Sequence, residues 1–384
     1  MKDLSTFQQR RITAAAWIAY CEQMKAAADL FLRDDFPITQ LDLAEGLRYL
    51  AHLSFASIQR FMDGADPAKP VFYLLCDERI KSGGDNPDNR YYVTAVSADY
   101  EYEIRGNFAE CAYYSIVALD RKEMTSGLSS EQRARRAASA RLDSETLVPE
   151  PDGSVVVRLS SDQRHGNWLR IDERTNMVIV RCTLETSGAR QVKLSVQRVD
   201  DKGPAPQISL DEVSAKLRAA AEHVVQTAHF FADWTGQFQQ HLNQLPLGDQ
   251  AYIRSTGGDP NILYYLSAWA IGPQQALVVR LPQIPPCRTW NFQLCNVWME
   301  SLDYTSARIH LNASTAKLDA DNGVTIVVCA SDPTHPNWLN TTGHSAGTMC
   351  MRFTGAEYPA TAITSVLPLN EARELGGRLR DPES

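Results

Sequence analysis

The stretch DGSVVVRLSSDQRHGNWL at residues 152–169 is repeated as NGVTIVVCASDPTHPNWL at residues 322–339. Eight of the 18 aligned positions are identical, and they include a His and a Trp. So many identical residues between two stretches aligned without a gap indicate an internal duplication. We therefore expect two modules that share one fold.

Shorter matches precede the repeated stretch. Gly-Gly-Asp at residues 83–85 corresponds to Gly-Gly-Asp at residues 257–259. Neither segment resembles a phosphate loop, because no Lys-Ser or Lys-Thr pair follows and the next element reads as a strand. We expect both segments to be tight turns in which Asp85 and Asp259 bond the local backbone.

Three segments have the apolar spacing of amphipathic helices. They are residues 8–33, residues 39–62 with Thr39 as the N-cap, and a segment that ends at Pro246 and begins with a capping box of Ser209 and Glu212. On the second of these helices, Glu45, Arg48 and Tyr49 either line a groove or, as we expect, form a solvated face.

Short β-prone runs broken by Gly, Asn, Asp and Pro follow the helices in both copies. In the first copy they are Tyr91–Ser97, Tyr102–Arg105, Cys111–Leu119, Ser154–Leu159, Asn176–Leu184 and Lys193–Val199. In the second copy they are Tyr264–Ala270, Ala276–Leu281, Gln293–Met299, Ala307–Asn312, Val324–Cys329 and Gly347–Phe353.

Helical patterns do not alternate with these strands, which disfavours a parallel sheet. The predicted fold class is therefore α+β and mainly β, with two related antiparallel β-sandwich modules, each preceded by amphipathic helices. The predicted domains are residues 1–200, with helices and the first module, and residues 208–360, with a long helix and the second module. Residues 361–384 are expected to form a C-terminal tail.

Composition excludes several classes of protein. The 384 residues are 44% hydrophobic and 22% charged, which is typical of globular domains. A net charge of -8 has the wrong sign for a nucleic-acid partner. No stretch is apolar enough for a membrane span, and the eight cysteines form no C-x-x-C pair. These features favour a cytoplasmic protein that binds neither nucleic acid nor membrane.

The second copy carries more ionisable side chains around its repeated motif than the first. His335 lies within this motif, His344 follows it, and Glu300 lies in the preceding strand region. If Gln293–Met299 continues as a strand, Trp298 and Glu300 share one face by alternation. A carboxylate beside an imidazole supports general acid/base catalysis, so we predict His335, His344 and Glu300 as catalytic residues.

Six further residues are predicted to bind a substrate because they combine aromatic plates with polar groups close to the motif. They are Trp298, Asp303, Tyr304, Asn337, Trp338 and Arg352. Three alternatives stay open. In the first, the motif is a structural device in which Trp plugs the sandwich while Asn and His satisfy loop backbone groups, as its presence in both copies favours. In the second, the catalytic candidates have rim or structural roles. In the third, Asp303, Asp332, His335 and His344 hold a metal, although no motif spacing requires one.

Residues 84–91, the run Tyr102–Gly106 and the two Asn-Trp-Leu motifs resemble the bacterial family called domain of unknown function twelve-fourteen. The resemblance extends over most of residues 40–355 and implies a β-sandwich-rich fold with added helices, with no settled activity. The chain diverges from the family pattern, in which Asn-Trp-Leu is commonly followed by Pro-x-Pro. Here Asn167-Trp168-Leu169 is followed by Arg170.

The leading functional hypothesis is an enzyme that performs metal-independent acid/base chemistry, a lyase or hydrolase step, without a cofactor. Its substrate is expected to be a small apolar or aromatic molecule in a pocket lined by Trp298, Tyr304 and Trp338. One alternative is a non-catalytic protein that binds a small molecule or a glycan. A second alternative is a scaffold whose apolar faces form a homo-oligomer.

Overall fold

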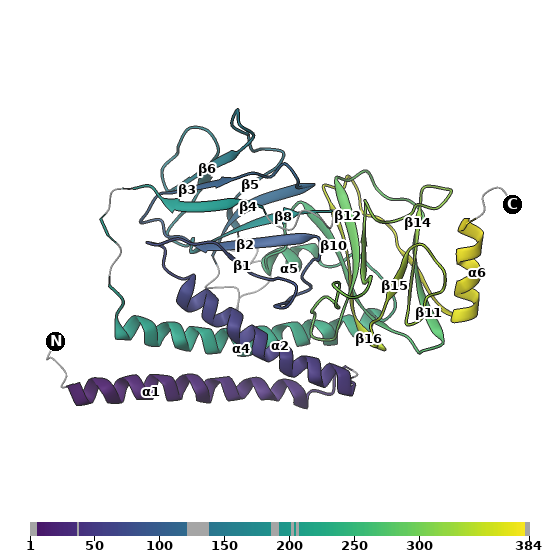
Figure 1. The fold of residues 1–384 in the computed structure, drawn as a ribbon, viewed down its shortest axis with the longest axis horizontal. Coiled ribbons are helices and arrows are strands. Elements are labelled where there is room, and N and C mark those ends of the chain that lie inside the picture. The colour runs from purple at the N-terminus through teal and green to yellow at the C-terminus, as the bar shows by residue number, and fades with distance from the viewer. Residues whose placement is uncertain are drawn as a thin grey trace.

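The computed structural model describes residues 6–36, 38–120, 138–185, 192–200, 203–204 and 207–380. Two β-rich modules lie side by side, and a layer of long helices runs along one side of them (Figure 1). Within the described part of the chain, no helix is both long and apolar enough to cross a membrane.

The helices begin where the capping residues predict. Thr39 Oγ1 accepts a hydrogen bond from the Asp42 backbone, and the Asp42 carboxylate accepts one from the Thr39 backbone, which completes a capping box. Ser209 similarly accepts from the Glu212 backbone. The helical elements are α1 (Thr6–Lys25), a 3-10 turn (Ala26–Leu32), α2 (Gln40–Ile58), a π-helical turn (Gln59–Asp63), α4 (Leu210–Phe238), a second 3-10 turn (Gln239–His241), α5 (Gln250–Ser255) and α6 (Leu369–Arg380).

The first module is a sandwich of two sheets with the orders β1-β2-β8-β4-β5 and β7-β6-β3-β9. Its strands are β1 (Tyr73–Leu74), β2 (Asn89–Ala95), β3 (Tyr102–Gly106), β4 (Tyr113–Leu119), β5 (Ala138–Asp143), β6 (Val155–Ser160), β7 (Trp168–Arg170), β8 (Met177–Thr183) and β9 (Leu194–Arg198). Neighbouring strands are antiparallel except for β6 and β7.

The second module repeats this plan with the sheet orders β10-β16-β12-β13 and β15-β14-β11-β17. Its strands are β10 (Ile262–Ala270), β11 (Gln275–Leu281), β12 (Thr289–Cys295), β13 (His310–Asn312), β14 (Val324–Cys329), β15 (Trp338–Asn340), β16 (Ala346–Thr354) and β17 (Ile363–Pro368). The parallel pair also recurs, here as β14 and β15. Apart from the additional β1, strand order is the same in both halves, which confirms two related modules.

Two details differ from the sequence-based expectations. β12 ends at Cys295, and residues 296–299 form a turn in which Met299 has a φ of 58°. The expected continuous strand through Met299, with Trp298 and Glu300 on one face, was therefore wrong. Residues 361–384, expected as a tail, contain β17, which pairs with β11, and α6.

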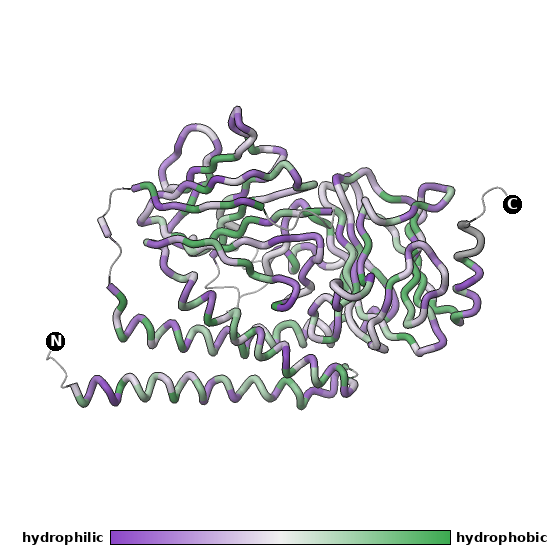
Figure 2. The backbone as a smooth tube through the Cα atoms, in the orientation of Figure 1, coloured by the Kyte–Doolittle hydropathy of each residue, from purple (hydrophilic) through white to green (hydrophobic). Residues whose placement is uncertain are grey.

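Each sandwich has its own apolar core between its two sheets. Figure 2 shows hydrophobic colour on strands of both modules, interspersed with hydrophilic colour. A third cluster joins the helices to the second module: Trp298 and Val297 pack among side chains of the first 3-10 turn, α2 and α4. The helices that precede the first module in sequence thus also cover part of the second.

Two buried arginines at equivalent positions join the modules. Arg181 on β8 donates to the Asp259 carboxylate (2.9 Å) and to the Gly257 carbonyl (3.2 Å), both in the second module. Arg352 on β16 donates to the Gly84 carbonyl of the first module. Each arginine therefore holds the Gly-Gly-Asp turn of the other sandwich, and we call this reciprocal contact the intermodule clasp.

The two aspartates of these turns have partners in the other module. The expectation that each bonds the local backbone was wrong for Asp85 and was confirmed for Asp259. Asp85 accepts hydrogen bonds from the backbone (2.9 Å) and hydroxyl (2.7 Å) of Ser301 in the second module. Asp259 keeps one local bond, from the Asn261 backbone, and also faces Arg181, Arg141, Tyr113 and Ser115 of the first module. Buried carboxylates need such partners, because an unpaired charge is costly away from water.

Replacing Asp259 with Asn tests the clasp. The change leaves the Arg181 guanidinium buried without its counter-charge, and we expect the free energy of unfolding to fall by about 3–5 kcal/mol. Urea denaturation followed by circular dichroism measures this change. The matched control is Asp321→Asn, which removes an exposed partner of Arg280 and is expected to have little effect. Equal effects of both changes would contradict a structural role for the clasp.

Candidate functional site

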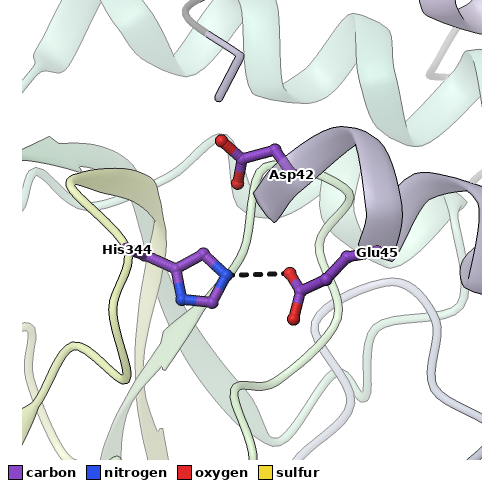
Figure 3. Close-up of side chains that lie close together, drawn as sticks. All are labelled: Asp42, Glu45 and His344. Atoms are coloured by element: carbon purple, nitrogen blue, oxygen red, sulfur yellow. Dashed lines mark hydrogen bonds and ion pairs between the residues drawn. The ribbon is translucent and has the colours of Figure 1, made fainter. Parts of the chain in front are cut away.

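A group of buried polar side chains lies where α2 meets two turns of the second module. Glu45 comes from α2, Asn296 and Glu300 come from the turn after β12, and His344 comes from the turn before β16. With Asp42 of α2, these residues form what we call the α2 cluster. Figure 3 shows the Asp42 and Glu45 side chains reaching from the helix toward the His344 ring.

The start of α2 is fixed against the second module by two contacts. The Trp298 indole donates to the Asp42 carbonyl at 2.7 Å. A Cβ added at Gly46 would lie 2.8 Å from the Trp298 ring and 2.6 Å from Phe31, so only glycine permits this close approach. These contacts place Glu45, one residue before Gly46, next to His344.

The turn at residues 296–300 is held by the Asn296 side chain. Its Oδ1 accepts from the backbones of Trp298 and Glu300, both at 3.0 Å. Its Nδ2 donates to Glu45 Oε2 at 2.9 Å and to Glu300 Oε2 at 3.1 Å. One amide therefore orients both glutamates of the site.

The first module holds the far end of the same turn. Lys81 donates to the Ser301 and Leu302 carbonyls, at 2.8 Å and 3.0 Å, and Asp85 binds Ser301. The Gly84 backbone donates to the Met299 carbonyl at 2.6 Å. Since a non-glycine residue with positive φ is strained, the turn depends on these external contacts.

His344 is fixed on both sides of its ring. Nε2 lies 2.8 Å from Glu45 Oε2, and Nδ1 lies 3.0 Å from the Thr341 carbonyl (Figure 3 shows the first contact). A carbonyl oxygen only accepts hydrogen bonds, so Nδ1 carries a proton. Nε2 is thus the ring atom that faces Glu45.

The pKa values of the two glutamates are shifted in opposite directions. Burial raises the pKa of Glu300 to about 7, and the Asn296 hydrogen bond and the Arg48 charge only partly oppose this effect. Burial would also raise the pKa of Glu45, but the hydrogen bond and charge of His344 lower it overall. Burial would lower the pKa of His344, and Glu45 raises it overall. Below about pH 7, a protonated Glu300 therefore sits near an ionised Glu45.

Arg48 covers the solvent side of the cluster. Its guanidinium lies 3.3 Å from Glu45 Oε1 and 3.9 Å from Glu300 Oε2, and its side chain is 56% exposed. Leu41, Glu45 and Arg48 lie on one face of α2 by their spacing. The expectation that this helix face is solvated was wrong for Glu45 and Tyr49, because Tyr49 is buried and Glu45 faces the cluster.

Three side chains of the cluster carry groups suited to a cation. One potential ligand atom each from Asp42, Glu45 and His344 lies within 4.8 Å of the other two. The metal site considered from the sequence, with Asp303, Asp332, His335 and His344, is not formed in this way. Asp303 binds Thr305 and Ser306, and Asp332 binds the Thr334 backbone.

Comparisons with known proteins agree with the architecture. The family model described as Protein of unknown function (DUF1214) matches residues 88–184, which contain β2 to β8. A crystal structure of an uncharacterised protein from Burkholderia cenocepacia has 36% sequence identity and a TM-score of 0.86. The alignment covers 93% of this chain and 97% of that chain. The chain belongs to the DUF1214 family.

More distant similarity adds little to this assignment. A crystal structure of a protein from Vibrio parahaemolyticus is 12% identical, with a TM-score of 0.48 over 89% of this chain and 100% of that chain. No curated protein matches the chain. The DUF1214 match itself covers the first module, whereas the α2 cluster is formed by α2 and the second module.

In this DUF1214 protein, two of the three predicted catalytic residues lie in the α2 cluster. His344 contacts Glu45, and Glu300 is joined to Glu45 through Asn296. His335 lies elsewhere in the second module. Its Nδ1 accepts from the Asn337 backbone at 3.1 Å, its carbonyl accepts from the Trp338 backbone, and burial lowers its pKa. These contacts fasten the loop before β15.

The repeated Asn-Trp pair fastens the same loop in both modules. Asn337 Nδ2 donates to the carbonyls of Lys317 and Thr325, as Asn167 Nδ2 donates to two carbonyls of the first module. The Trp338 indole donates to the Cys329 carbonyl, and its ring packs with α6 and the outer face of its sheet. The geometry supports a structural role for the motif.

The three aromatic residues expected to line one pocket lie in three different places. Trp298 packs edge-on against Phe31 and Phe36, and Trp338 packs near α6. Tyr304 lies beneath Lys81, whose Nζ is 4.5 Å from the ring centre. Asp303 caps its own turn, and bonds from Thr305 and Ser306 lower its pKa to about 2. A shared aromatic pocket was therefore a wrong expectation.

Arg352, predicted to bind substrate, belongs to the intermodule clasp. It also donates to Gln293 Oε1 at 2.7 Å and borders a small crevice between the modules. The crevice has a volume of about 10 Å³, which corresponds to roughly one water molecule. Sequence reasoning missed Asp42 and Asn296, whose roles depend on contacts between distant segments.

The pKa of Glu300 predicts how stability depends on pH. Its folded-state value is raised above 4.5, so the stability associated with the protonated form is lost as the pH rises through about 7. We expect Glu300→Gln to gain stability relative to the parent between pH 5 and pH 8, by up to about 3 kcal/mol. Urea denaturation across this range measures the difference.

Glu145→Gln is the matched control, because Glu145 is exposed. Its difference from the parent should stay constant with pH. A constant difference for Glu300→Gln as well would show that Glu300 does not titrate in this range.

Proposed function

We propose that this protein is an enzyme that performs acid/base chemistry, of the hydrolase or lyase type, at the α2 cluster. The observation that carries the proposal is the arrangement of Glu300. Its Oε2 is hydrogen-bonded to Asn296, while its Oε1 is buried without a hydrogen-bond partner. In the proposal, this unpartnered oxygen is the atom that exchanges a proton with the reacting molecule.

Glu300 serves as the proton-transferring group. A buried carboxyl group next to a second carboxylate and an imidazole is a common arrangement in acid/base catalysis, because the neighbouring groups tune its proton affinity. Glu45 and His344 are locked to each other at 2.8 Å and present the second polar edge of the site. Asn296 keeps Glu300 and Glu45 at a fixed separation.

The substrate is proposed to be a small molecule that approaches beside Arg48. The exposed guanidinium lies over both glutamates and offers a positive charge or hydrogen bonds to a polar substrate group. Leu41, on the same helix face, is 39% exposed and adds an apolar edge. This combination favours a small, partly apolar compound with one polar or anionic group.

The proposal is tested with two kinds of probe. Hydrolysis is measured with p-nitrophenyl acetate and a set of small lactones, and lyase-type proton abstraction is measured by deuterium exchange from D₂O into small hydroxy and keto acids. We expect turnover by the parent and a loss of roughly 100-fold or more for Glu300→Gln, as is typical when a general acid or base is removed.

Asp303→Asn and His335→Gln are matched controls, because both residues lie in the second module outside the α2 cluster. They should retain parental turnover. Absence of turnover by the parent with every probe, or unchanged turnover by Glu300→Gln, would overturn the proposal. Binding of a probe without turnover would favour a non-catalytic binding protein.

A further inference from the structure

We propose that Asp42, Glu45 and His344 form a binding site for a divalent transition-metal cation such as Zn²⁺ or Mn²⁺. The proposal adds a metal to the site described above and does not depend on catalysis, since a cation can bind whether or not the site turns over a substrate. It replaces the expectation of metal-independent chemistry.

The three side chains offer a suitable donor set at a suitable spacing. One atom from each lies within 4.8 Å of the others, and two carboxylates with one imidazole are common ligands of these metals. Ligand atoms bind zinc at about 2.0–2.2 Å, so a slight approach of the side chains closes the site. Two negative charges would then face one divalent cation.

The Asp42 carboxylate provides an independent observation. Oδ2 accepts from the backbone (2.8 Å) and hydroxyl (2.7 Å) of Thr39, whereas Oδ1 is buried and has no hydrogen-bond partner. Asp42 is only 2% exposed, and Figure 3 shows its carboxylate directed toward the side on which His344 and Glu45 meet. A buried carboxylate oxygen without a partner is unfavourable, and a cation would supply that partner.

The surroundings of His344 and Glu45 match those of metal ligands. His344 Nδ1 donates to the Thr341 carbonyl and leaves Nε2 facing the two carboxylates. Histidine ligands are typically oriented by such a hydrogen bond from the other ring nitrogen. Glu45 Oε2 is likewise oriented by Asn296 Nδ2 at 2.9 Å.

Three protein ligands leave a coordination position for water or substrate, as in catalytic metal sites. Glu300 is the nearest candidate for proton transfer at that position, because Asn296 joins it to Glu45. The cation would polarise the substrate or a bound water while Glu300 exchanges the proton.

Calorimetry of the full chain, after removal of metals with EDTA, tests the site. Zn²⁺ titration is expected to show one site per chain, and Co²⁺ should give the visible absorption bands of a bound ion. Asp42→Asn, Glu45→Gln and His344→Gln should each weaken Zn²⁺ binding by roughly 100-fold. His335→Gln and Asp332→Asn, at other positions of the second module, should bind as the parent does.

Circular dichroism establishes that each variant is folded, and Glu45→Gln and His344→Gln both leave the Thr39 cap untouched. Absence of Zn²⁺ and Mn²⁺ binding by the parent, or parental Zn²⁺ affinity in folded Glu45→Gln and His344→Gln, would overturn the proposal. Glu300→Gln separates the two proposals, because it should keep Zn²⁺ binding and lose turnover. Cation binding without turnover supports the metal site alone.

Discussion

The structure depends on charged groups that are buried between the two modules and are bonded to partners in the opposite module. Arg181 requires Asp259 and the Gly257 carbonyl, and Arg352 requires the Gly84 carbonyl. Removing such groups from water is favourable only when their partners are in place. The position of one sandwich against the other is therefore set by a few directed contacts, in addition to apolar packing.

The Gly-Gly-Asp turn that Arg352 holds also supports the geometry of the α2 cluster. Gly84, Lys81 and Asp85 bond the backbone at Met299 and Ser301, and this backbone carries Glu300. On the other side, Trp298 anchors the start of α2, which carries Glu45. The proposed site is thus assembled from a helix, a loop of the first module and two turns of the second.

Sequence reasoning was most successful where the signal is local or repeated. The duplicated stretch predicted two modules, and the capping residues Thr39 and Ser209 predicted the starts of two helices, because these features depend on neighbouring residues. It was less successful for the cluster. Glu45 and His344 are 299 positions apart, and no periodic pattern encodes their contact.

Local patterns were also misleading at two places. Alternation of apolar residues suggested a strand through Met299, but the Asn296 side chain bonds its own turn and ends the strand. The repeated His-x-Asn-Trp-Leu motif drew attention to His335 and Trp338, although the motif recurs because both sandwiches need the same loop fastening. Only the differences between copies, such as His344 opposite Arg174, pointed to the cluster.

The reciprocal arrangement of the two arginines also bears on the origin of the protein. A polypeptide with only one such sandwich would expose its arginine and its glycine-rich turn, and a second identical subunit related by two-fold rotation would satisfy both at once. Gene fusion of such a symmetric dimer would place both arginine contacts within one chain. It would also free one half to change its loops while the other half maintained the ancestral packing.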